Sequence, residues 1–240
     1  MRLGLPVEGT NDRPSLRFKF VADIQGLPPL LTGHLNGVIT LNVAEADDPE
    51  RERRRVSFHE PYRTLLGHVR HEVAHYYWDR LIANSDRIEG YRKLFGDETV
   101  DYAVALKKYY EQGAPVDWRD RYVSAYASAH PWEDWAETWA HYFHIIDMVE
   151  TAASFGMTLR PKHPAAKAMT ANLQNISGTN ASFDSLLENW FPLTYALNSL
   201  NRGMGLLDAY PFALSGIAIE RLRFIHDVCH SRPANTLPSA

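Results

Sequence analysis

The fold of this chain is decided by the stretch Pro61-Tyr-Arg-Thr-Leu-Leu-Gly-His-Val-Arg-His71-Glu72-Val-Ala-His75-Tyr-Tyr-Trp-Asp-Arg-Leu-Ile-Ala83. We predict one helix over residues 61–83, with the proline in its first turn, where a missing N–H group does no harm. His71 and His75 then lie one above the other on one helix face and can bind a single zinc ion. Glu72, offset by one position, can reach a water molecule on that metal instead of the metal itself. The pattern is typical of a zinc hydrolase with Glu72 as its general base.

A catalytic zinc ion needs a third protein ligand and one open position for water. The metzincin arrangement is excluded, because Leu81 stands ten residues after the first histidine, where that class has its third. A glutamate in the first turn of a second helix can complete the set, and we predict Glu133 as this ligand, with Glu137 as the alternative. Glu137 lies one turn further along the same face, so we expect it to orient a ligand histidine or to make an ordinary contact with His141.

Outside these helices, the sequence changes character at about residue 60. Residues 16–23 alternate apolar and polar side chains for part of their length, and residues 37–44 are rich in β-branched side chains, so both are predicted strands. The Gly- and Pro-containing segment between them is predicted as a loop or a hairpin connection. Further helices are predicted over residues 86–95, 100–112, 118–127, 131–154, 182–201 and 212–230.

The predicted fold class is α+β, with a small N-terminal β-sheet followed by a mainly helical region that carries the active-site helix at a cleft. We expect one domain over residues 1–240, made of a β-rich part (1–60), the metal-site helices (61–155) and a helical C-terminal lobe (156–240). The charged segment 47–55 is predicted as a short surface helix, and residues 231–240 as a loose tail.

Composition limits the classes of function. Hydrophobic residues make up 45% and charged residues 22% of the 240 residues, which is typical of a globular protein and excludes disorder as the main state. A net charge of −4 argues against nucleic acid as a partner. The single cysteine, Cys229, cannot form a thiolate metal site, so any metal must use histidine and carboxylate ligands. Without an apolar signal-peptide core or a membrane-spanning run, we expect a cytoplasmic location and no membrane.

Other histidines lie close to the motif in sequence. His68, His141 and His144 stand at helical spacing from the predicted site, and we interpret them as hydrogen-bonded histidines packed between helices rather than as ligands. His130 precedes Pro131 and is expected to cap the second helix or to line the cleft. Aromatic side chains on the two motif helices are interpreted as core packing, with a substrate-stacking surface as the alternative: Tyr76, Tyr77, Trp78, Trp132, Trp135 and Trp139.

The motif His71-Glu-Val-Ala-His75, followed by Glu133-Asp-Trp-Ala-Glu137, resembles the gluzincin metallopeptidases, whose zinc ligands are two histidines and a glutamate. In gluzincins of the anthrax lethal factor type, a tyrosine seven residues before the ligand glutamate helps to stabilise the transition state. Tyr126 occupies that position here. The resemblance therefore implies that Tyr126 donates a hydrogen bond to the developing oxyanion, with a packed aromatic side chain as the alternative role.

Longer stretches are similar to the bacterial "putative zinc-binding metallopeptidase" family, and this similarity spans most of the chain. They are Leu31-Thr-Gly-His-Leu-Asn-Gly-Val-Ile-Thr-Leu-Asn-Val-Ala-Glu-Ala-Asp47 and Glu60-Pro-Tyr-Arg-Thr-Leu-Leu-Gly-His-Val-Arg-His-Glu-Val-Ala-His-Tyr-Tyr-Trp-Asp79. Members often begin with a Cys-rich zinc ribbon, which this sequence lacks. The resemblance implies one Zn²⁺ per chain and a peptide or protein substrate. In zincins an edge strand binds extended substrate, and residues 37–44 are the expected edge.

Two alternatives from other classes stay open at this point. The first is a zinc-binding regulatory or interaction module that keeps the metal helix for its structure and has no catalytic activity. The second is a zinc hydrolase that acts on a non-peptide amide. The sequence identifies neither the bond that is cleaved nor the oligomeric state.

Overall fold

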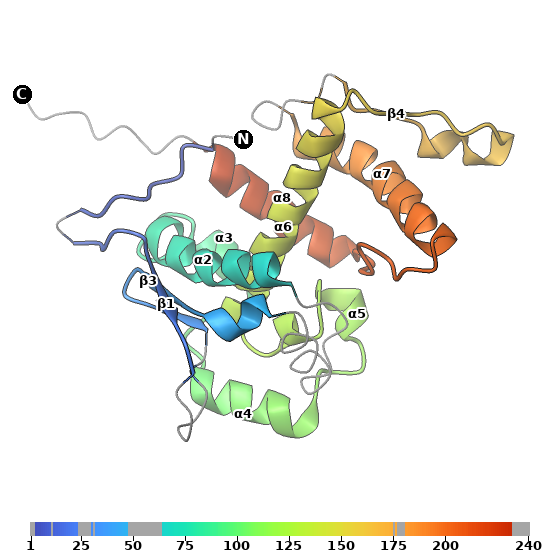
Figure 1. The fold of residues 1–240 in the computed structure, drawn as a ribbon. Coiled ribbons are helices and arrows are strands. Elements are labelled where there is room, and N and C mark those ends of the chain that lie inside the picture. The colour runs from blue at the N-terminus through green and yellow to red at the C-terminus, as the bar shows by residue number, and fades with distance from the viewer. Residues whose placement is uncertain are drawn as a thin grey trace, which may run out of the picture.

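The computed structural model describes residues 3–10, 12–23, 30, 32–47, 64–174, 176 and 181–231. Within these ranges a small sheet near the N-terminus is followed by a mostly helical region, which confirms the predicted α+β class (Figure 1). The strands are β1 (Arg17–Val21), β2 (Gly33–Leu35), β3 (Val38–Asn42), β4 (Thr158–Leu159) and β5 (Ala171–Asn172). The α-helices are α2 (Leu65–Leu81), α3 (Ile88–Phe95), α4 (Tyr102–Gln112), α5 (Trp118–Arg121), α6 (Pro131–Ser154), α7 (Phe183–Gly203) and α8 (Gly216–His230). Short 3₁₀ turns are η1 (Val43–Ala46), η2 (Tyr126–Ser128) and η3 (Pro164–Met169).

The N-terminal sheet has the strand order β1-β3-β2, with β1 parallel and β2 antiparallel to β3. The predicted strands correspond to β1 and β3, but β2 lies in the segment that was predicted as a loop or a hairpin connection. Asn36 and Gly37 join β2 to β3 with positive φ angles of 49° and 77°. An Asn-Gly pair of this kind is the common two-residue hairpin turn, so the dipeptide carried a signal for β2.

The expectation that residues 37–44 form an edge strand is wrong. β3 is paired on both sides, by β1 and by β2, and is the central strand of the sheet. Its Ile39 is fully buried and Leu41 is nearly so. A strand with two such apolar side chains is most stable in the centre of a sheet, where strands on both sides cover it. β1 and β2 are therefore the edges of the described sheet.

The motif helix α2 begins at Leu65 rather than at residue 61. The side chain of Thr64 caps it by accepting a hydrogen bond from the Gly67 N–H group at 3.0 Å, and Thr64 itself has extended backbone angles. Pro61, predicted for the first turn, lies outside the described residues. At its other end α2 stops at Leu81, two residues before the predicted end.

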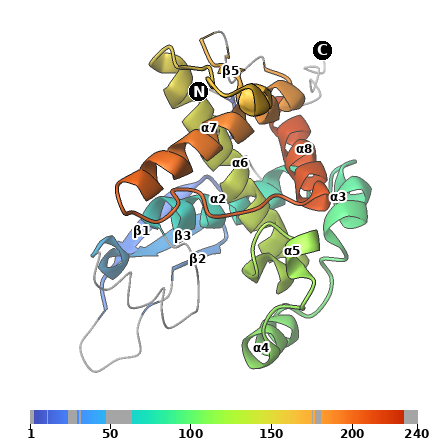
Figure 2. The same ribbon diagram turned by 90° about the vertical axis from the view of Figure 1, so that its right-hand side faces the viewer.

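The second motif helix, α6, has the predicted bounds. His130 caps it, accepting a hydrogen bond from the Trp132 N–H group through Nδ1 at 3.1 Å, and Pro131 takes the first helical position. Figure 2 shows α6 running through the middle of the helical region, beside α2, α7 and α8. The aromatic side chains on the facing sides of α2 and α6 are core residues, as expected, with Trp135 fully buried and Trp139 nearly so.

The helix predicted over residues 118–127 is wrong beyond its first turn. α5 ends at Arg121, Tyr122 is extended, and the chain continues into the 3₁₀ turn η2. The break has a physical reason, because it buries Val123 against Ala127 and Ala218. It also turns Ser124 toward α6, where its hydroxyl contacts Glu137. Burial of Val123 and the hydrogen bond of Ser124 thus outweigh continued helix formation.

The C-terminal region contains α7 and α8, close to the predicted helices, and the two-stranded pair β4-β5, which was not predicted. No helix among the described residues combines the length and the apolar character needed to cross a bilayer. Most of the predicted charged helix 47–55 and of the predicted tail 231–240 lies outside the described residues.

Arg221 on α8 joins several elements near the start of α6. Its guanidinium lies 2.8 Å from the carboxylate of Asp134 in an ion pair that is almost completely buried. The same guanidinium donates hydrogen bonds to the carbonyl of Leu94 in α3 at 2.9 Å and to the carbonyl of Arg121 at the end of α5 at 2.6 Å. One side chain therefore holds the ends of two helices against the first turn of α6.

We predict that Arg221→Met lowers the free energy of unfolding by about 3–5 kcal/mol, because it removes the cationic partner of the buried carboxylate of Asp134. The measurement is urea denaturation followed by circular dichroism. The double variant Arg221→Met/Asp134→Asn serves as the control, since it removes the unpaired charge, and we expect it to recover part of the loss. A single variant as stable as the wild type would contradict this role.

Candidate metal centre

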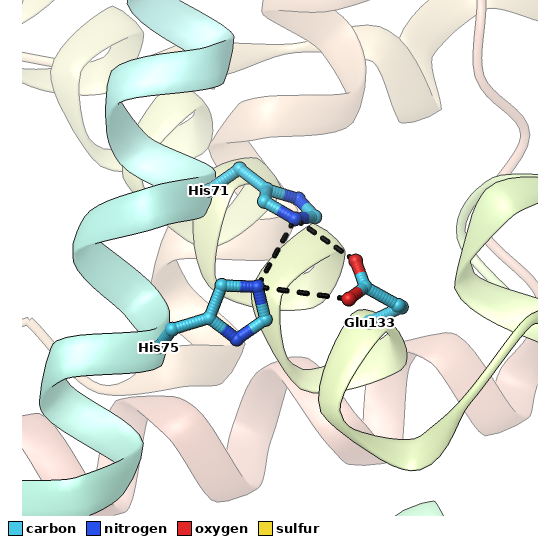
Figure 3. Close-up of side chains that lie close together, drawn as sticks. All are labelled: His71, His75 and Glu133. Carbon is cyan, nitrogen blue, oxygen red and sulfur yellow. Dashed lines mark hydrogen bonds and ion pairs between the residues drawn. The ribbon is translucent and has the colours of Figure 1, made fainter. Parts of the chain in front are cut away.

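Three side chains from two helices converge in the gap between α2 and α6 (Figure 3). His71 Nε2 lies 3.0 Å from Glu133 Oε2, and His75 Nε2 lies 3.8 Å from Glu133 Oε1. The two Nε2 atoms are 3.3 Å apart. All three ligand atoms are within 4.8 Å of one another, and among the described residues this is the group that could hold a metal ion.

The spacing of these atoms fits a tetrahedral metal. Two atoms that each lie about 2.0–2.1 Å from one tetrahedral zinc ion are about 3.3–3.4 Å apart. The distances from His71 Nε2 to Glu133 Oε2, 3.0 Å, and to His75 Nε2, 3.3 Å, are close to this value. Moreover, Glu133 Oε2 is fully buried and faces Nε2 of His71, an atom that could share a metal ion with it. Two imidazoles and one carboxylate are also a usual ligand set for zinc. The residues therefore fit a zinc ion.

Local sequence accounts for this convergence. His71 and His75 are four residues apart on α2, so their rings lie on one face, with centroids 5.0 Å apart. Glu133 stands in the first turn of α6, where the helix dipole favours a negative charge. Its side chain is 1% exposed, against 13% and 19% for the two histidines, so the carboxylate forms the floor of the site.

A fourth side chain orients the first histidine. Glu137, one turn after Glu133, accepts a hydrogen bond from His71 Nδ1 at 2.8 Å through Oε1. Its other oxygen accepts a hydrogen bond from the Ser124 hydroxyl at 2.6 Å. His71 is thereby fixed in the tautomer that leaves Nε2 facing Glu133 and His75, the usual arrangement for a metal-binding histidine with a carboxylate behind it. Sequence analysis did not single out Ser124.

The charges in the site favour a cation. Burial opposes the ionised forms of Glu133 and Glu137, but the hydrogen bonds and charge of His71 outweigh it and lower the pKa of each carboxyl to about 2. Burial also opposes a charge on His71, yet the two carboxylates raise its pKa well above the usual value. For His75, burial dominates and lowers the pKa to about 4. Two carboxylates that favour their ionised form therefore lie beside the two imidazoles, and this arrangement attracts a cation.

Tyr102 is a residue of the site that sequence analysis missed. It opens α4, and its hydroxyl donates a hydrogen bond to Glu133 Oε1 at 2.7 Å. Burial and the neighbouring negative charge of Glu133 raise the pKa of Tyr102, so the phenol keeps its proton and acts as a donor. No spacing in the sequence links α4 to α6, and one tyrosine among twelve carries no signal by itself.

The two predicted catalytic residues lie beside the cluster. Glu72 follows His71 on α2 and is partly exposed, and burial raises the pKa of its carboxyl. Tyr126, on η2, has its ring centroid 6.0 Å from that of His71. Burial and the charge of Glu133 raise the pKa of Tyr126, so its hydroxyl is a hydrogen-bond donor. The ring also packs against Tyr109, so the alternative of a packed aromatic side chain has a structural basis as well.

The other histidines near the motif in sequence have partners outside the metal cluster, as predicted. His68 donates to the buried carboxylate of Glu45, His141 hydrogen-bonds the hydroxyl of Tyr210 at 2.7 Å, and Nδ1 of His144 accepts from Arg70 at 2.5 Å. His130 is the cap of α6, the first of its two expected roles, and its Nε2 donates to the carbonyl of Val100 at 3.0 Å.

The similarity of this chain to known proteins extends beyond the motif. The model of a family described as "Putative zinc-binding metallo-peptidase" matches residues 1–228. Uncharacterized proteins of Mycobacterium bovis and of two Mycobacterium tuberculosis strains, CDC 1551 and H37Rv, are each 45% identical over 227 residues, which is 94% of this chain. The chain spans 64% of the length of these relatives. No solved structure matches this chain.

We predict that Glu137→Gln lowers the affinity for zinc by about 10- to 100-fold, because His71 loses the carboxylate that orients its ring and raises its basicity. Competition with a chromogenic chelator measures this change. Glu188→Gln makes the same substitution at an exposed position of α7 and should bind zinc like the wild type. Equal affinity of the Glu137 variant and the wild type would show that the hydrogen bond to His71 has no such role.

Proposed function

This chain belongs to the family described as putative zinc-binding metallo-peptidases, and we propose that it is a zinc metallopeptidase of the gluzincin type. In this proposal His71, His75 and Glu133 hold one zinc ion, Glu72 is the general base and Tyr126 stabilises the transition state. The observation that carries it is the convergence of two imidazoles from α2 and a buried carboxylate from α6 at distances that suit one tetrahedral metal.

The number of ligands supports a catalytic rather than a structural site. Structural zinc ions are enclosed by four protein ligands, whereas catalytic ones have three and keep one position for water. Within the described part of the chain, the cluster offers three ligands. Its histidine side chains are 13% and 19% exposed, so the two rings are not completely enclosed by protein.

A zinc ion bound here would supply a Lewis acid that polarises a carbonyl and makes water more acidic. Glu72 would take a proton from the attacking water and pass it to the departing amine. The raised pKa of Glu72 supports this role, because a more basic carboxylate accepts a proton more readily near neutral pH. The tyrosine at position 126 would donate its phenolic proton in a hydrogen bond to the oxygen that gains negative charge.

Substrate binding is proposed along the edge of the N-terminal sheet that faces the site. Of the two edges, β2 makes the more extensive contact with α2. His34 on β2 has its ring 6.2 Å from that of Tyr76 on α2. The outer side of β2 is unpaired among the described residues, so an extended peptide could add there as a further strand. A peptide or protein is therefore the proposed substrate.

We also propose that residues 1–240 form one domain. Support comes from the match of the family model over residues 1–228 and from the position of α6, which contributes to the metal cluster at its start and packs against α7 and α8 further along. A single core that includes both the site and the C-terminal helices is expected of one domain.

We predict that the purified wild type contains about one zinc ion per chain and that His75→Ala contains almost none, because two ligands are too few for a stable site. Elemental analysis of protein purified without added metal measures both. His163→Ala changes an exposed histidine and should keep its zinc. Wild-type protein without zinc after reconstitution, or a zinc-loaded His75 variant, would contradict the assignment of these ligands.

We predict that Glu72→Gln keeps its zinc but lowers peptide hydrolysis by about 10²- to 10⁴-fold, since it loses the group that takes the proton from water. The measurement is cleavage of a peptide library followed by mass spectrometry, with Glu188→Gln as the control. Undiminished turnover by the Glu72 variant would refute the mechanism. A zinc-loaded wild type that cleaves no peptide and binds no hydroxamate would instead favour a non-catalytic module.

A further inference from the structure

The helix α4 carries a tyrosine that reaches the candidate ligand Glu133. Asp101 caps this helix by accepting a hydrogen bond from the Val104 N–H group at 2.9 Å, and Tyr102 is its first residue. None of the residues of α4 is buried within the described structure, and Figure 1 shows the helix at the periphery of the molecule. Tyr102 is 37% exposed, so its position is not explained by burial in the core.

The ring of Tyr102 is held by two neighbours at the start of α6. Its centroid lies 5.1 Å from that of His130 and 5.9 Å from that of Trp132. His130 is itself fixed, because one nitrogen caps α6 and the other donates to the carbonyl of Val100. The phenol is therefore aimed at Glu133 by a rigid surface, and the hydroxyl makes its 2.7 Å hydrogen bond at a set position.

The two oxygens of Glu133 have different surroundings. Oε1 accepts the hydrogen bond from Tyr102 and lies 3.8 Å from His75 Nε2. Oε2 is buried and lies 3.0 Å from His71 Nε2, on the side of the candidate metal site. A carboxylate with one oxygen already engaged by a neutral donor has its plane fixed, and only its second oxygen has full capacity to bind a metal.

We propose that Tyr102 is a positioning residue of the metal centre, whose hydroxyl holds Oε1 of Glu133 so that Oε2 alone is presented to the metal. This inference rests on the proposed function, because it takes Glu133 as a ligand. Tyr102 touches neither the metal nor the substrate and acts only through Glu133. Without the phenol, the carboxylate of Glu133 can rotate about its terminal bond. Metal binding must then order the carboxylate, and this costs binding free energy.

The same contact links α4 to the metal centre. The first turn of this helix is docked by the hydroxyl of Tyr102 and by the two ring contacts, and Tyr109 further along packs against Tyr126. A metal ion bound to Glu133 would fix the position of this carboxylate, which accepts the hydrogen bond from Tyr102. Metal binding and the docking of α4 should therefore stabilise each other.

Two variants separate the hydroxyl from the ring. Tyr102→Phe removes a single oxygen atom and keeps the ring, whereas Tyr102→Leu removes both. We expect Tyr102→Phe to lower the affinity for zinc by about 10- to 100-fold, the usual effect of losing a hydrogen bond to a metal ligand, and Tyr102→Leu to lose a similar amount. Chelator competition measures the affinities, and circular dichroism verifies the fold. Tyr195→Phe removes an exposed hydroxyl on α7 and is the matched control.

Cobalt(II) in place of zinc gives a second readout that does not depend on activity. The visible absorption of Co(II) reports coordination number, so we expect a weaker spectrum for Tyr102→Phe than for the wild type, as both oxygens of Glu133 become able to coordinate. An unchanged affinity or an unchanged spectrum of Tyr102→Phe would overturn the inference. Loss of affinity in Tyr102→Leu alone would also overturn it, because the ring and not the hydroxyl would then be responsible.

The outcomes distinguish this inference from the proposed function. If the wild type binds one zinc ion and cleaves peptides while Tyr102→Phe binds zinc equally well, only the role of Tyr102 fails. If the wild type binds zinc but cleaves no peptide, the proposed catalytic function fails and the affinities still decide the role of Tyr102. If the wild type binds no zinc, both proposals are overturned.

Discussion

Helices α2 and α6 pack against each other through stacked aromatic rings and one buried hydrogen bond. The rings of Tyr77 and Trp139 lie 5.1 Å apart and nearly parallel, and Trp135 Nε1 donates to the carbonyl of Ala74 at 2.9 Å. Large, rigid side chains in a buried interface allow little sliding of one helix along the other. Because one helix carries both histidines and the other carries Glu133, this packing sets the geometry of the whole metal cluster.

The buried carboxylates described in this protein each lie next to a histidine or an arginine. Glu133 and Glu137 share the imidazole of His71, Asp134 pairs with Arg221, and the buried Glu45 accepts from His68. An isolated carboxylate in such surroundings would be strongly destabilising, so each requires a partner. Among these carboxylates, Glu133 is the one whose partners are the two histidines of the candidate metal site.

The first turn of α6 is held from several sides. His130 caps the helix, Asp134 meets Arg221 from α8, and Glu133 meets Tyr102 from α4. The cap is local, whereas Tyr102 and Arg221 come from helices that are distant from this turn in sequence. Their shared effect is to limit the movement of the turn that carries the candidate ligand, and a site that is ordered before the metal binds has less entropy to lose.

The sequence by itself determined the features that follow from local spacing. The pairing of His71 with His75 on one face of a helix, the bounds of α6 and the placing of Glu133 in its first turn were all predicted, because helical periodicity and capping depend on residues close in the chain. The buried aromatic faces of the two helices were predicted on the same basis. The family resemblance added the expected metal and the position of Tyr126.

Only the tertiary structure decided which distant residues meet. The central place of β3, the end of α5 at Arg121, the hydroxyl of Ser124 on Glu137 and the phenol of Tyr102 on Glu133 all depend on the packing of separate elements. No periodicity connects such residues, since their contacts arise when burial of apolar surface brings the elements together and the polar groups then find partners. For this protein, the sequence determined the candidate ligands through local helix geometry, and the tertiary packing decided what orients them.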